Sequence, residues 1–339
     1  MAVTPRSPDA ALTQRVSDLV EGYWSTQVIA AAVQLGVPDK LDPAKDVETL
    51  AREVAAHAPS LQRLLRAMQT LGLVEATDGN LFALTEAGRL LRADAVGSVR
   101  GRVLFASGML WNQFADLADV VRTGERGAHA PPDFETLDPV SLKVFQQAMA
   151  ESSLKAARDA AQVYDFGRFA RLLDVGGGFG GVLAYLMDAF PGLKGDVFDL
   201  PMVGEGATSF LAGAGLADRA GFIGGDFFKA IPSGYDAYLF KYILHDWADE
   251  PALAILKACR AAIGPDARVV ILEQVVPDRL APCFDHRAVI RADLTMLTVG
   301  GKERTAAQYR ALLAEAGFDL AAIIPTASSF SVLEAEPRQ

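Results

Sequence analysis

The sequence has little of what several classes of protein depend on. Its two cysteines, Cys259 and Cys283, show no paired spacing, which excludes a disulfide framework and argues against a cysteine-based metal site. Lysine and arginine total 32 against 42 aspartates and glutamates, so the formal net charge is −10. Such a chain lacks the clustered cations that neutralise phosphates, and we therefore expect no nucleic-acid partner.

Long apolar stretches are also missing. No run approaches the ~18 uninterrupted apolar residues of a membrane span, and the opening residues, MAVTPRSPDA, contain no apolar segment typical of a secretory signal. We therefore expect a cytoplasmic protein with no membrane partner. Hydrophobic residues nevertheless make up 51% of the 339 residues, which is a globular composition. This length suits two domains of roughly 100–200 residues each.

From about residue 11 to residue 160 the pattern is helical, because apolar residues recur every three or four positions. The predicted elements are helices at 23–37, 46–56 and 60–71 and a hairpin at 73–85. Gly36 closes the first helix, and Asp78 with Gly79 forms the turn of the hairpin. Two helices followed by a two-stranded wing is the order of a winged-helix domain.

The charge of this segment bears on whether it binds DNA. Between Asp46 and Leu90 there are six acidic and four basic residues, a net charge of −2, which is the wrong sign for a phosphate-binding surface. We therefore interpret residues 1–100 as a helical packing and dimerisation domain. Two further helices, predicted at 101–122 and 141–164, flank a loop rich in proline and glycine. Residues 101–165 are thus expected to form a helical linker that contributes to a ligand pocket.

From Phe169 onward, short apolar or β-branched runs alternate with helical stretches. The predicted strands are ARLLDV, GDVFD, AGFIG, DAYLF and RVVILE. This alternation predicts a doubly wound, mainly parallel, Rossmann-like α/β sheet over residues 166–339. A helix at 286–298 and another beginning at Thr305 then precede a strand pair near 320–324 and 329–333. Thr305 and Gln308 have the spacing of a capping box.

The segment LLDVGGGFGGVLAYL, residues 172–186, runs from a strand through five glycines into a helix. Glycines allow a tight turn and a close approach to a ligand, while the helix N-terminus offers unpaired N–H groups. Residues 176–181 satisfy G-x-G-x-x-G, so an NAD site, an S-adenosylmethionine site and a purely structural turn are all open. Asp199, at the end of the next strand, could bind the ribose hydroxyls of either cofactor.

Two features favour the methyl donor. Asp174 lies in the strand before the glycines, where a carboxylate suits an amino group and a sulfonium better than a pyrophosphate. Asp226 and Phe227 follow a third strand, where they could bind the adenine amino group and cover the ring. Asp226 alone would fit a turn cap equally well. The combination therefore favours S-adenosylmethionine.

The segment DAYLFKYILHDWADEPA, residues 236–252, holds the main candidate for catalysis. His245 falls just beyond the strand that ends near Lys241, at the carboxyl edge where open α/β sheets place their sites. A phenol, with a pKa of about 10, must lose its proton to become a good nucleophile, and a positioned imidazole can accept it. Glu273, expected at the end of the following strand, and Glu303 could both converge on His245. An isolated histidine beside a tryptophan would also fit a packed, satisfied residue.

These segments together resemble a known family. LLDVGGGFG, VFDLP, GDFF, FKYILHDWADE, VVILEQVVPD and DLTMLTVGGKERT, in this order, are similar to the O-methyltransferases of the caffeate, hydroxyneurosporene and acetylserotonin type. The resemblance covers most of the chain, because that family also has a helical, winged-helix-like N-terminal dimerisation domain. It implies a homodimer, and S-adenosylmethionine as cofactor with S-adenosylhomocysteine as product. It also implies methyl transfer without a metal ion.

The resemblance further implies roles for single residues. His245 would be the general base, flanked by Glu273 and Glu303. The implied cofactor contacts are Asp174, Gly176, Gly178, Asp199, Leu200, Asp226, Phe227 and Lys241. The residues in the regions that line the family's acceptor pocket are Phe105, Met109, Trp111, Phe145, Met149, Asp246 and Met296. The apolar members of this last group also fit ordinary core packing.

Other functions stay open at the level of sequence. Members of the family have drifted to decarboxylation or hydroxylation of polyketides with the same fold and cofactor, and the intact set of His245, Glu273 and Glu303 argues against that drift. An NAD-dependent oxidoreductase lacks its nicotinamide-site signature here, and a winged-helix regulator is disfavoured by the acidic N-terminal half. The apolar pocket residues suit an aromatic or polyketide-like acceptor without identifying it.

Overall fold

The computed structural model describes residues 10–77, 79–131 and 138–339. The predicted turn residue Asp78 and part of the loop after Arg122 lie outside the described residues. The chain divides into two compact units, which we call unit 1 (residues 1–111 and 133–151) and unit 2 (residues 112–132 and 152–339). The segment predicted as a linker, 101–165, is thus divided between them. Each unit is described by itself.

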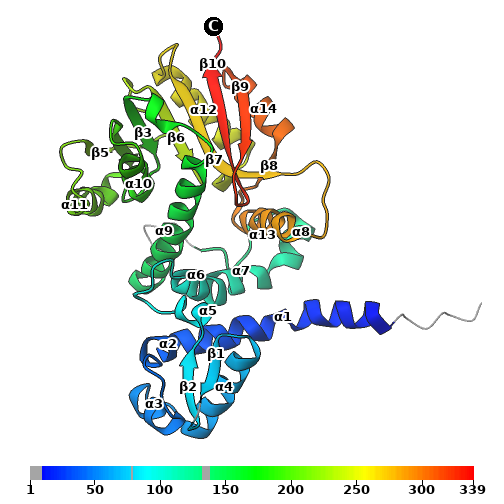
Figure 1. Ribbon diagram of the computed structural model, residues 1–339. Coiled ribbons are helices and arrows are strands. Elements are labelled where there is room, and N and C mark those ends of the chain that lie inside the picture. Colours follow the sequence, from blue (N-terminus) through cyan, green and yellow to red (C-terminus); the bar gives the residue numbers. More distant parts are fainter. Residues whose placement is uncertain (1–9, 78, 132–137) are drawn as a thin grey trace, which may run out of the picture. The chain divides into compact units, whose positions relative to one another are not determined.

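Unit 1 consists of helices and one hairpin (Figure 1). Its elements are α1 (Ala10–Gln34), α2 (Val37–Lys40), α3 (Val47–Glu53), α4 (Ala58–Thr70), β1 (Val74–Thr77), β2 (Leu81–Leu84), α5 (Glu86–Arg89), α6 (Arg100–Phe105), the π-helical turn η1 (Ala106–Leu110) and the first part of α9 (Pro139–Ala161). Leu50, Leu65 and Met68 are fully buried in its core. The order of helices and hairpin confirms the predicted winged-helix-like domain.

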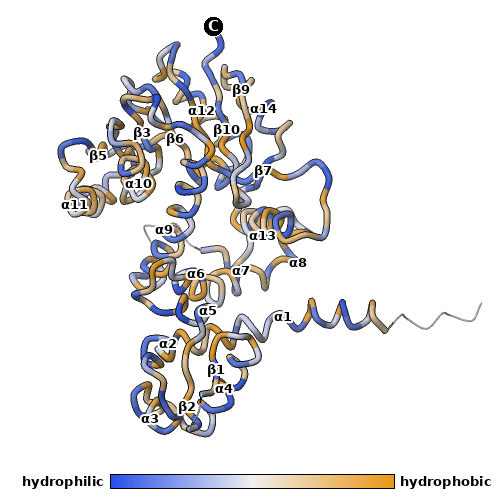
Figure 2. Tube along the Cα trace, in the orientation of Figure 1, coloured by the Kyte–Doolittle hydropathy of each residue, from blue (hydrophilic) through white to orange (hydrophobic). Residues whose placement is uncertain are grey.

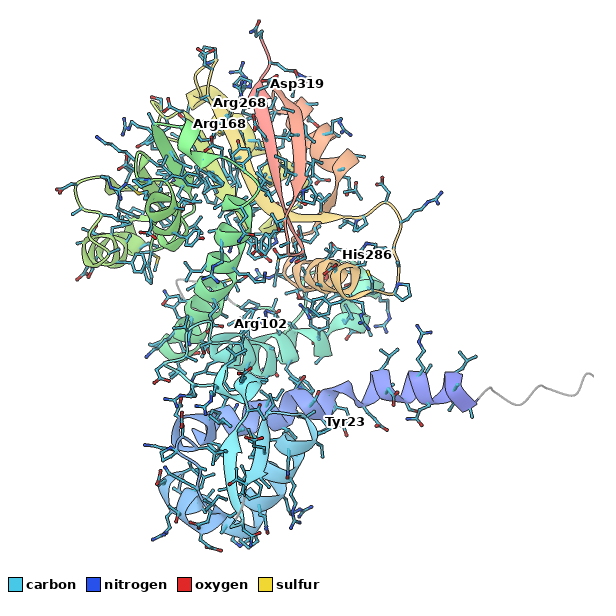
Figure 3. All side chains as sticks on the ribbon, in the orientation of Figure 1. Tyr23, Arg102, Arg168, Arg268, His286 and Asp319 are labelled. Carbon is cyan, nitrogen blue, oxygen red and sulfur yellow. The ribbon has the colours of Figure 1, made fainter. Side chains whose placement is uncertain are left out.

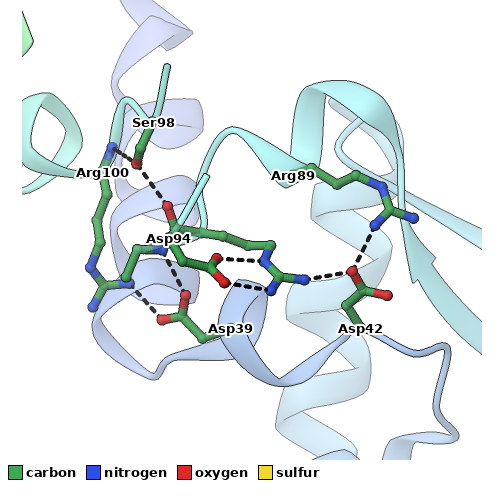
Figure 4. Close-up of polar contacts among 8 residues, drawn as sticks. Asp39, Asp42, Arg89, Asp94, Ser98 and Arg100 are labelled. Atoms are coloured by element: carbon green, nitrogen blue, oxygen red, sulfur yellow. Dashed lines mark hydrogen bonds and ion pairs between the residues drawn. The ribbon is translucent and has the colours of Figure 1, made fainter. Parts of the chain in front are cut away.

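Polar contacts join α2 and the residues just after it to the chain that follows the hairpin (Figure 4). Asp39 accepts a hydrogen bond from Arg100 at 2.9 Å, and Asp42 accepts from Arg89 at 2.7 Å and from Arg92 at 2.5 Å. Exposed ion pairs of this kind contribute roughly 0–1 kcal/mol each, so the apolar core is the main source of stability. The network instead fixes the path of the chain between α5 and α6.

The segment predicted as a single helix at 101–122 is helical but interrupted. The chain there forms α6, η1, α7 (Trp111–Ala115) and α8 (Leu117–Thr123) in succession. Ser107 and Gly108 lie in the π-helical turn, and small residues of this kind hold the α-helical hydrogen-bond ladder only weakly. Apolar periodicity therefore indicated helix here but could not locate its interruption.

Unit 2 contains the sheet. Its elements after α8 and the second part of α9 are η3 (Phe166–Arg168), β3 (Arg171–Val175), α10 (Gly181–Ala189), β4 (Lys194–Asp199), η4 (Pro201–Val203), α11 (Gly204–Gly213), β5 (Ala220–Gly224), β6 (Ala237–Lys241), η5 (Leu244–Asp246), α12 (Asp249–Ala262), β7 (Arg268–Val276), α13 (Phe284–Val299), β8 (Arg304–Thr305), α14 (Ala306–Glu315), β9 (Phe318–Pro325) and β10 (Phe330–Pro337). The strand order is β5-β4-β3-β6-β7-β10-β9 (Figure 1). The strands from β5 to β7 are parallel, and β10 pairs antiparallel with both β7 and β9.

Helices cover both faces of this sheet. Tyr238 and Phe240 of β6 pack into a core that α12 and α14 complete, whereas Ala237 and Leu239 pack into a second core with α9, α10 and α11. Every residue of β6 is buried, and Figure 2 shows the central strands as predominantly hydrophobic. Burial on both faces explains why β6 reads as a continuous apolar run. The predicted doubly wound α/β fold is confirmed.

Details of unit 2 both support and correct the predicted elements. Thr305 caps α14, and the capping box with Gln308 is formed as predicted. Glu273 was expected at the end of a strand, but β7 continues to Val276, so Glu273 lies within the strand and is fully buried. In the part of the chain that the structure describes, no helix combines the length and apolar character needed to span a membrane.

Candidate active site

The glycine segment after β3 forms a loop in which most residues have no side chain. Gly176, Gly178 and Gly180 have φ angles of 70°, 57° and 85°, in the left-handed region that residues with side chains rarely adopt. A Cβ at Gly177 would lie 2.6 Å from the carboxylate of Asp174, whereas a Cβ at Gly178 would meet no atom within 4 Å. The loop follows the carboxyl end of β3, and the strand order reverses between β3 and β6, which is where open α/β sheets bind their ligands.

Two ionisable groups are buried on the neighbouring strands β3 and β6. Asp174 is 1% exposed, and Lys241 is 9% exposed and donates to Ser153 Oγ at 2.6 Å. Burial, together with repulsion from Asp199, raises the pKa of Asp174 to about 7. Burial lowers the pKa of Lys241 to about 7 against the attraction of Asp174 and other carboxylates. Burial therefore disfavours the charged form of both groups, and each partly offsets this effect on the other.

The buried carboxylate of Asp174 provides a test of whether the cofactor fits. Among the described residues its Oδ2 atom has no hydrogen-bond partner. A buried oxygen in this state is costly unless a ligand, a water or a proton satisfies it. The amino and sulfonium groups of S-adenosylmethionine carry positive charge, so the open glycine loop and this oxygen fit that cofactor.

The end of β4 is tied to the same loop. Asp199 Oδ2 accepts a hydrogen bond from the backbone N–H of Gly178 at 2.8 Å, and its Oδ1 accepts from the N–H of Leu200 at 2.7 Å. Burial raises the pKa of Asp199, and these two hydrogen bonds oppose that rise. A carboxylate retains lone pairs beyond those two bonds. The structure thus brings together Asp174, Gly178 and Asp199, as the sequence suggested.

Asp226 and Phe227 follow the next strand, β5. Asp226 Oδ1 accepts from the N–H of Phe228 at 2.9 Å and its Oδ2 pairs with Lys229 at 3.1 Å, which is the arrangement of a turn cap. Phe227 packs edge-on against Trp247, with ring centroids 6.4 Å apart. The turn therefore joins the ends of β5 and β6, whereas any contact of Asp226 with adenine stays a prediction.

His245 lies in η5, directly after β6, and is 6% exposed. Its Nδ1 atom is 2.8 Å from Glu303 Oε1, and its Nε2 atom is 3.3 Å from Asp246 Oδ1. Burial, the largest influence, lowers the pKa of His245, but the nearby charges of Asp246 and Glu303 outweigh it and raise this pKa to about 9. The imidazole is thus held between two carboxylates, one of which, Asp246, is partly exposed.

The side chain of Glu273 accepts hydrogen bonds from backbone amides rather than from the imidazole of His245. Its Oε1 atom accepts three hydrogen bonds, from the N–H groups of Ile243 at 3.1 Å, Leu244 at 2.7 Å and His245 at 3.2 Å. Its other oxygen accepts a short hydrogen bond from the hydroxyl of Tyr309. Three successive amides that converge on one oxygen form an anion-binding nest. Glu273 therefore fixes the main chain that carries His245.

Several residues of this site were missed by sequence reasoning. Arg304 is fully buried and donates to the carbonyls of Leu244 and Trp247 at 2.8 Å each. The ring of Tyr242 is stacked on His245, with centroids 4.3 Å apart and planes 3° from parallel. Both residues lie inside segments already singled out, but residue type alone did not distinguish them from packing residues.

The predicted acceptor-pocket residues are distributed over the two units. Phe105, Met109, Trp111, Phe145 and Met149 belong to unit 1, and Asp246 and Met296 belong to unit 2. Within unit 1 the structure brings Phe105 and Phe145 together, edge to face, with centroids 5.7 Å apart. Unit 2 has a separate, mostly apolar cavity of about 650 Å³, lined by α13 residues such as Phe284 and Arg291 with Phe114 and Leu280. None of the predicted site residues lines that cavity.

Comparison with known proteins places this geometry in a family. Residues 114–319 match the O-methyltransferase domain, and residues 17–94 match the O-methyltransferase dimerisation domain. The phenazine O-methyltransferase PhzM of Lysobacter antibioticus is 34% identical, over 99% of this chain and 100% of that protein. The mitomycin biosynthesis 6-O-methyltransferase of Streptomyces lavendulae is 36% identical, over 95% of both chains.

A solved structure extends the agreement to the fold. Human N-acetylserotonin methyltransferase, in complex with S-adenosylmethionine, has a TM-score of 0.88 at 27% identity, over 99% of this chain and 100% of that chain. The two domain matches and the full-length relatives agree with the resemblance noted in the sequence. The chain belongs to the O-methyltransferase family and is an S-adenosylmethionine-dependent O-methyltransferase with a dimerisation domain.

Proposed function

We propose that the acceptor is a hydroxyl group of an aromatic or polyketide-like small molecule, and that His245 removes its proton without the help of a metal ion. The observation that carries this proposal is the environment of His245. Its imidazole is buried after β6, with Nδ1 on Glu303 and Nε2 directed at the partly exposed Asp246. A hydroxyl that reaches Nε2 would meet a nitrogen whose ring is already oriented.

The raised pKa of His245 suits this role. A phenol has a pKa of about 10, so proton transfer to an ordinary imidazole of pKa about 6.5 is unfavourable by about 3.5 pKa units. A base with a pKa of about 9 reduces this gap to about one unit. The cost is that a raised pKa leaves a smaller fraction of His245 neutral at pH 7. Glu303 and Asp246 stabilise the imidazolium formed when the proton arrives.

The cofactor would be held by residues on the other strand ends. S-adenosylmethionine supplies, when bound, an electrophilic methyl group. We propose that the glycine loop, including Gly176, lies against it, that Asp199 with Leu200 binds the ribose and that Asp174 and Lys241 bind the amino-acid end. Asp226 and Phe227 would bind the adenine. In support, Asp174 Oδ2 has no hydrogen-bond partner among the described residues, and Asp199 retains lone pairs beyond its two hydrogen bonds.

The absence of a metal requirement is a separate part of the proposal. Within residues 10–77, 79–131 and 138–339, no group of three or more histidine, cysteine, aspartate or glutamate side chains is arranged to hold an ion. Methyl transfer should therefore continue in the presence of EDTA. Loss of activity with EDTA and recovery with a divalent ion would contradict this part.

The test of the base is the H245Q variant, assayed with labelled cofactor and a panel of phenols, flavonoids, anthracyclines and phenazines. We expect kcat to fall by about 10²–10⁴-fold, because general-base catalysis contributes that much, while calorimetry shows unchanged S-adenosylmethionine binding. H57Q is the matched control, since His57 is exposed in unit 1 and its Nδ1 atom lies 3.0 Å from Ser60 Oγ. Full activity of H245Q on a neutral phenol would exclude His245 as the base.

The products distinguish methyl transfer from a drifted reaction. S-adenosylhomocysteine should form in a one-to-one ratio with methylated acceptor. Conversion of an acceptor without S-adenosylhomocysteine would instead indicate decarboxylation or hydroxylation with the cofactor as a structural group.

A further inference from the structure

The aromatic ring of Tyr242 lies flat against the imidazole of His245. The two ring centroids are 4.3 Å apart and the planes differ by 3°. The carboxylates at Nδ1 and Nε2 anchor the imidazole at two atoms in its plane, but they leave the ring free to tilt about the axis through those atoms. A parallel neighbour removes this freedom, because the ring cannot tilt without losing contact or colliding.

Tyr242 is itself held from several directions. Gln274 Nε2 donates to its hydroxyl at 3.2 Å, and the ring of Phe330 packs against it at 4.7 Å between centroids. The ammonium of Lys241 lies 4.1 Å from the ring centroid, which is the geometry of a cation–π contact. The tyrosine ring therefore contacts the candidate base on one hand and a candidate cofactor residue on the other.

The backbone at Tyr242 adds an independent observation. Its φ angle is 55°, in the left-handed region that bulky residues rarely adopt. This turn directs the amides of residues 243–245 towards Glu273. Glycine or asparagine would adopt this conformation more easily, so the local backbone does not account for a tyrosine at this position. The contact of its ring with His245 does account for it.

We propose that Tyr242 is a positioning residue that holds the imidazole of His245 in the orientation in which Nδ1 meets Glu303 and Nε2 faces Asp246, on the side where we expect the acceptor to bind. This inference rests on the proposed function, in which His245 is the base. The residue acts through His245 and through the order of the η5 segment, and it has no chemical step of its own.

The test compares Y242F, which keeps the ring, with Y242N, which keeps a left-handed backbone and loses the ring. We expect Y242F to stay within about threefold of the parent kcat. Y242N should lower kcat by about 10–100-fold, the scale expected when a catalytic group is misplaced, with unchanged S-adenosylmethionine binding. Y242G replaces Y242N if the asparagine variant does not fold. F190L is the matched control, since it removes an aromatic ring of unit 2 that packs against Phe166, with centroids 6.0 Å apart.

Two readouts separate positioning from a general loss of structure. The chain has only four histidines, so the ring proton signals of His245 can be assigned by NMR of the cofactor-bound protein with H245Q as reference. The ring-current shift from Tyr242 should persist in Y242F and F190L and disappear in Y242N. In the double variant Y242N/H245Q, the tyrosine change should cost no further activity, because residues that act as a unit are not additive.

The outcomes distinguish this inference from the proposed function. If H245Q keeps full activity, the proposed base is wrong, whatever the NMR signals show. If H245Q loses activity but Y242N keeps its kcat, or if the losses multiply in the double variant, His245 remains the base and the role of Tyr242 is refuted.

Discussion

At the scale of the residue, three carboxylates near His245 have different partners. Glu303 contacts Nδ1, Asp246 faces Nε2, and Glu273 accepts from backbone amides. Only Glu303 and Asp246 can act directly on the charge of the imidazole through contact, whereas Glu273 acts through the position of the chain. Their substitutions should therefore have different signatures.

The pH dependence of the rate provides one such signature. Because the neutral imidazole is the base and its pKa is about 9, kcat/KM for the acceptor should rise with pH from 7 towards 9. E303Q removes a negative charge beside Nδ1, so the imidazolium is less stabilised and the pKa of His245 falls. The rise of kcat/KM should therefore occur at lower pH in E303Q than in the parent.

The same acceptor must be used for both enzymes, since ionisation of the phenol also raises the rate with pH. The measurement is the complete pH profile of kcat/KM for the parent and for E303Q. If E303Q is active and its kcat/KM rises over the same pH range as that of the parent, the rise reflects ionisation of the acceptor rather than of His245.

Sequence reasoning at this scale found the residues but not their contacts. His245, Glu273 and Glu303 were placed at one edge of the sheet from strand ends alone. Which atom each carboxylate meets depends on where the strands stop, and β7 runs to Val276 instead of stopping at Glu273. The stack of Tyr242 on His245 depends on a left-handed φ angle that no spacing pattern encodes for tyrosine.

At the scale of the element, the short η5 segment is held by the chain before β8. Gly301 packs against it so closely that a Cβ would lie 2.3 Å from the carbonyl oxygen of His245 and 2.8 Å from the carbonyl carbon of Asp246. The N–H of Lys302 donates to the carbonyl of His245 at 2.8 Å. Close packing against η5 thus explains why residue 301 is a glycine.

G301A is therefore expected to displace η5 and the base with it. The colliding atoms are backbone, so they cannot rotate away, and overpacking of this kind costs about 1–3 kcal/mol of stability. We expect a lower melting temperature and a fall in kcat of about tenfold or more. The control is G213A, because a Cβ at Gly213, in α11, would meet no atom within 4 Å. Equal behaviour of G301A and G213A would contradict the close packing at η5.

At the scale of the whole molecule, the first half of α1 presents an apolar surface. The predicted helix began at Tyr23, but α1 begins at Ala10, and apolar side chains on one of its faces are exposed. These are Leu12 (59%), Val16 (61%), Leu19 (65%), Val20 (70%) and Tyr23 (58%). Figure 2 shows hydrophobic and hydrophilic turns alternating there, and Figure 3 labels Tyr23. Sequence periodicity cannot say whether such a face is covered within one chain or by a second.

We propose that this face, α1 residues 12–23, is buried in the homodimer. The match to a dimerisation domain begins at residue 17 and includes most of it. Burying one large apolar side chain is worth about 1.5–3 kcal/mol, so five such residues supply a substantial part of an interface. L19D places a charge within the face and should convert a dimer into a monomer in light scattering coupled to size exclusion. Glu21 points to the opposite side of the helix, two residues from both Leu19 and Tyr23, so E21S should remain dimeric. A dimeric L19D with an unchanged dissociation constant would exclude this face and move the interface elsewhere in the chain.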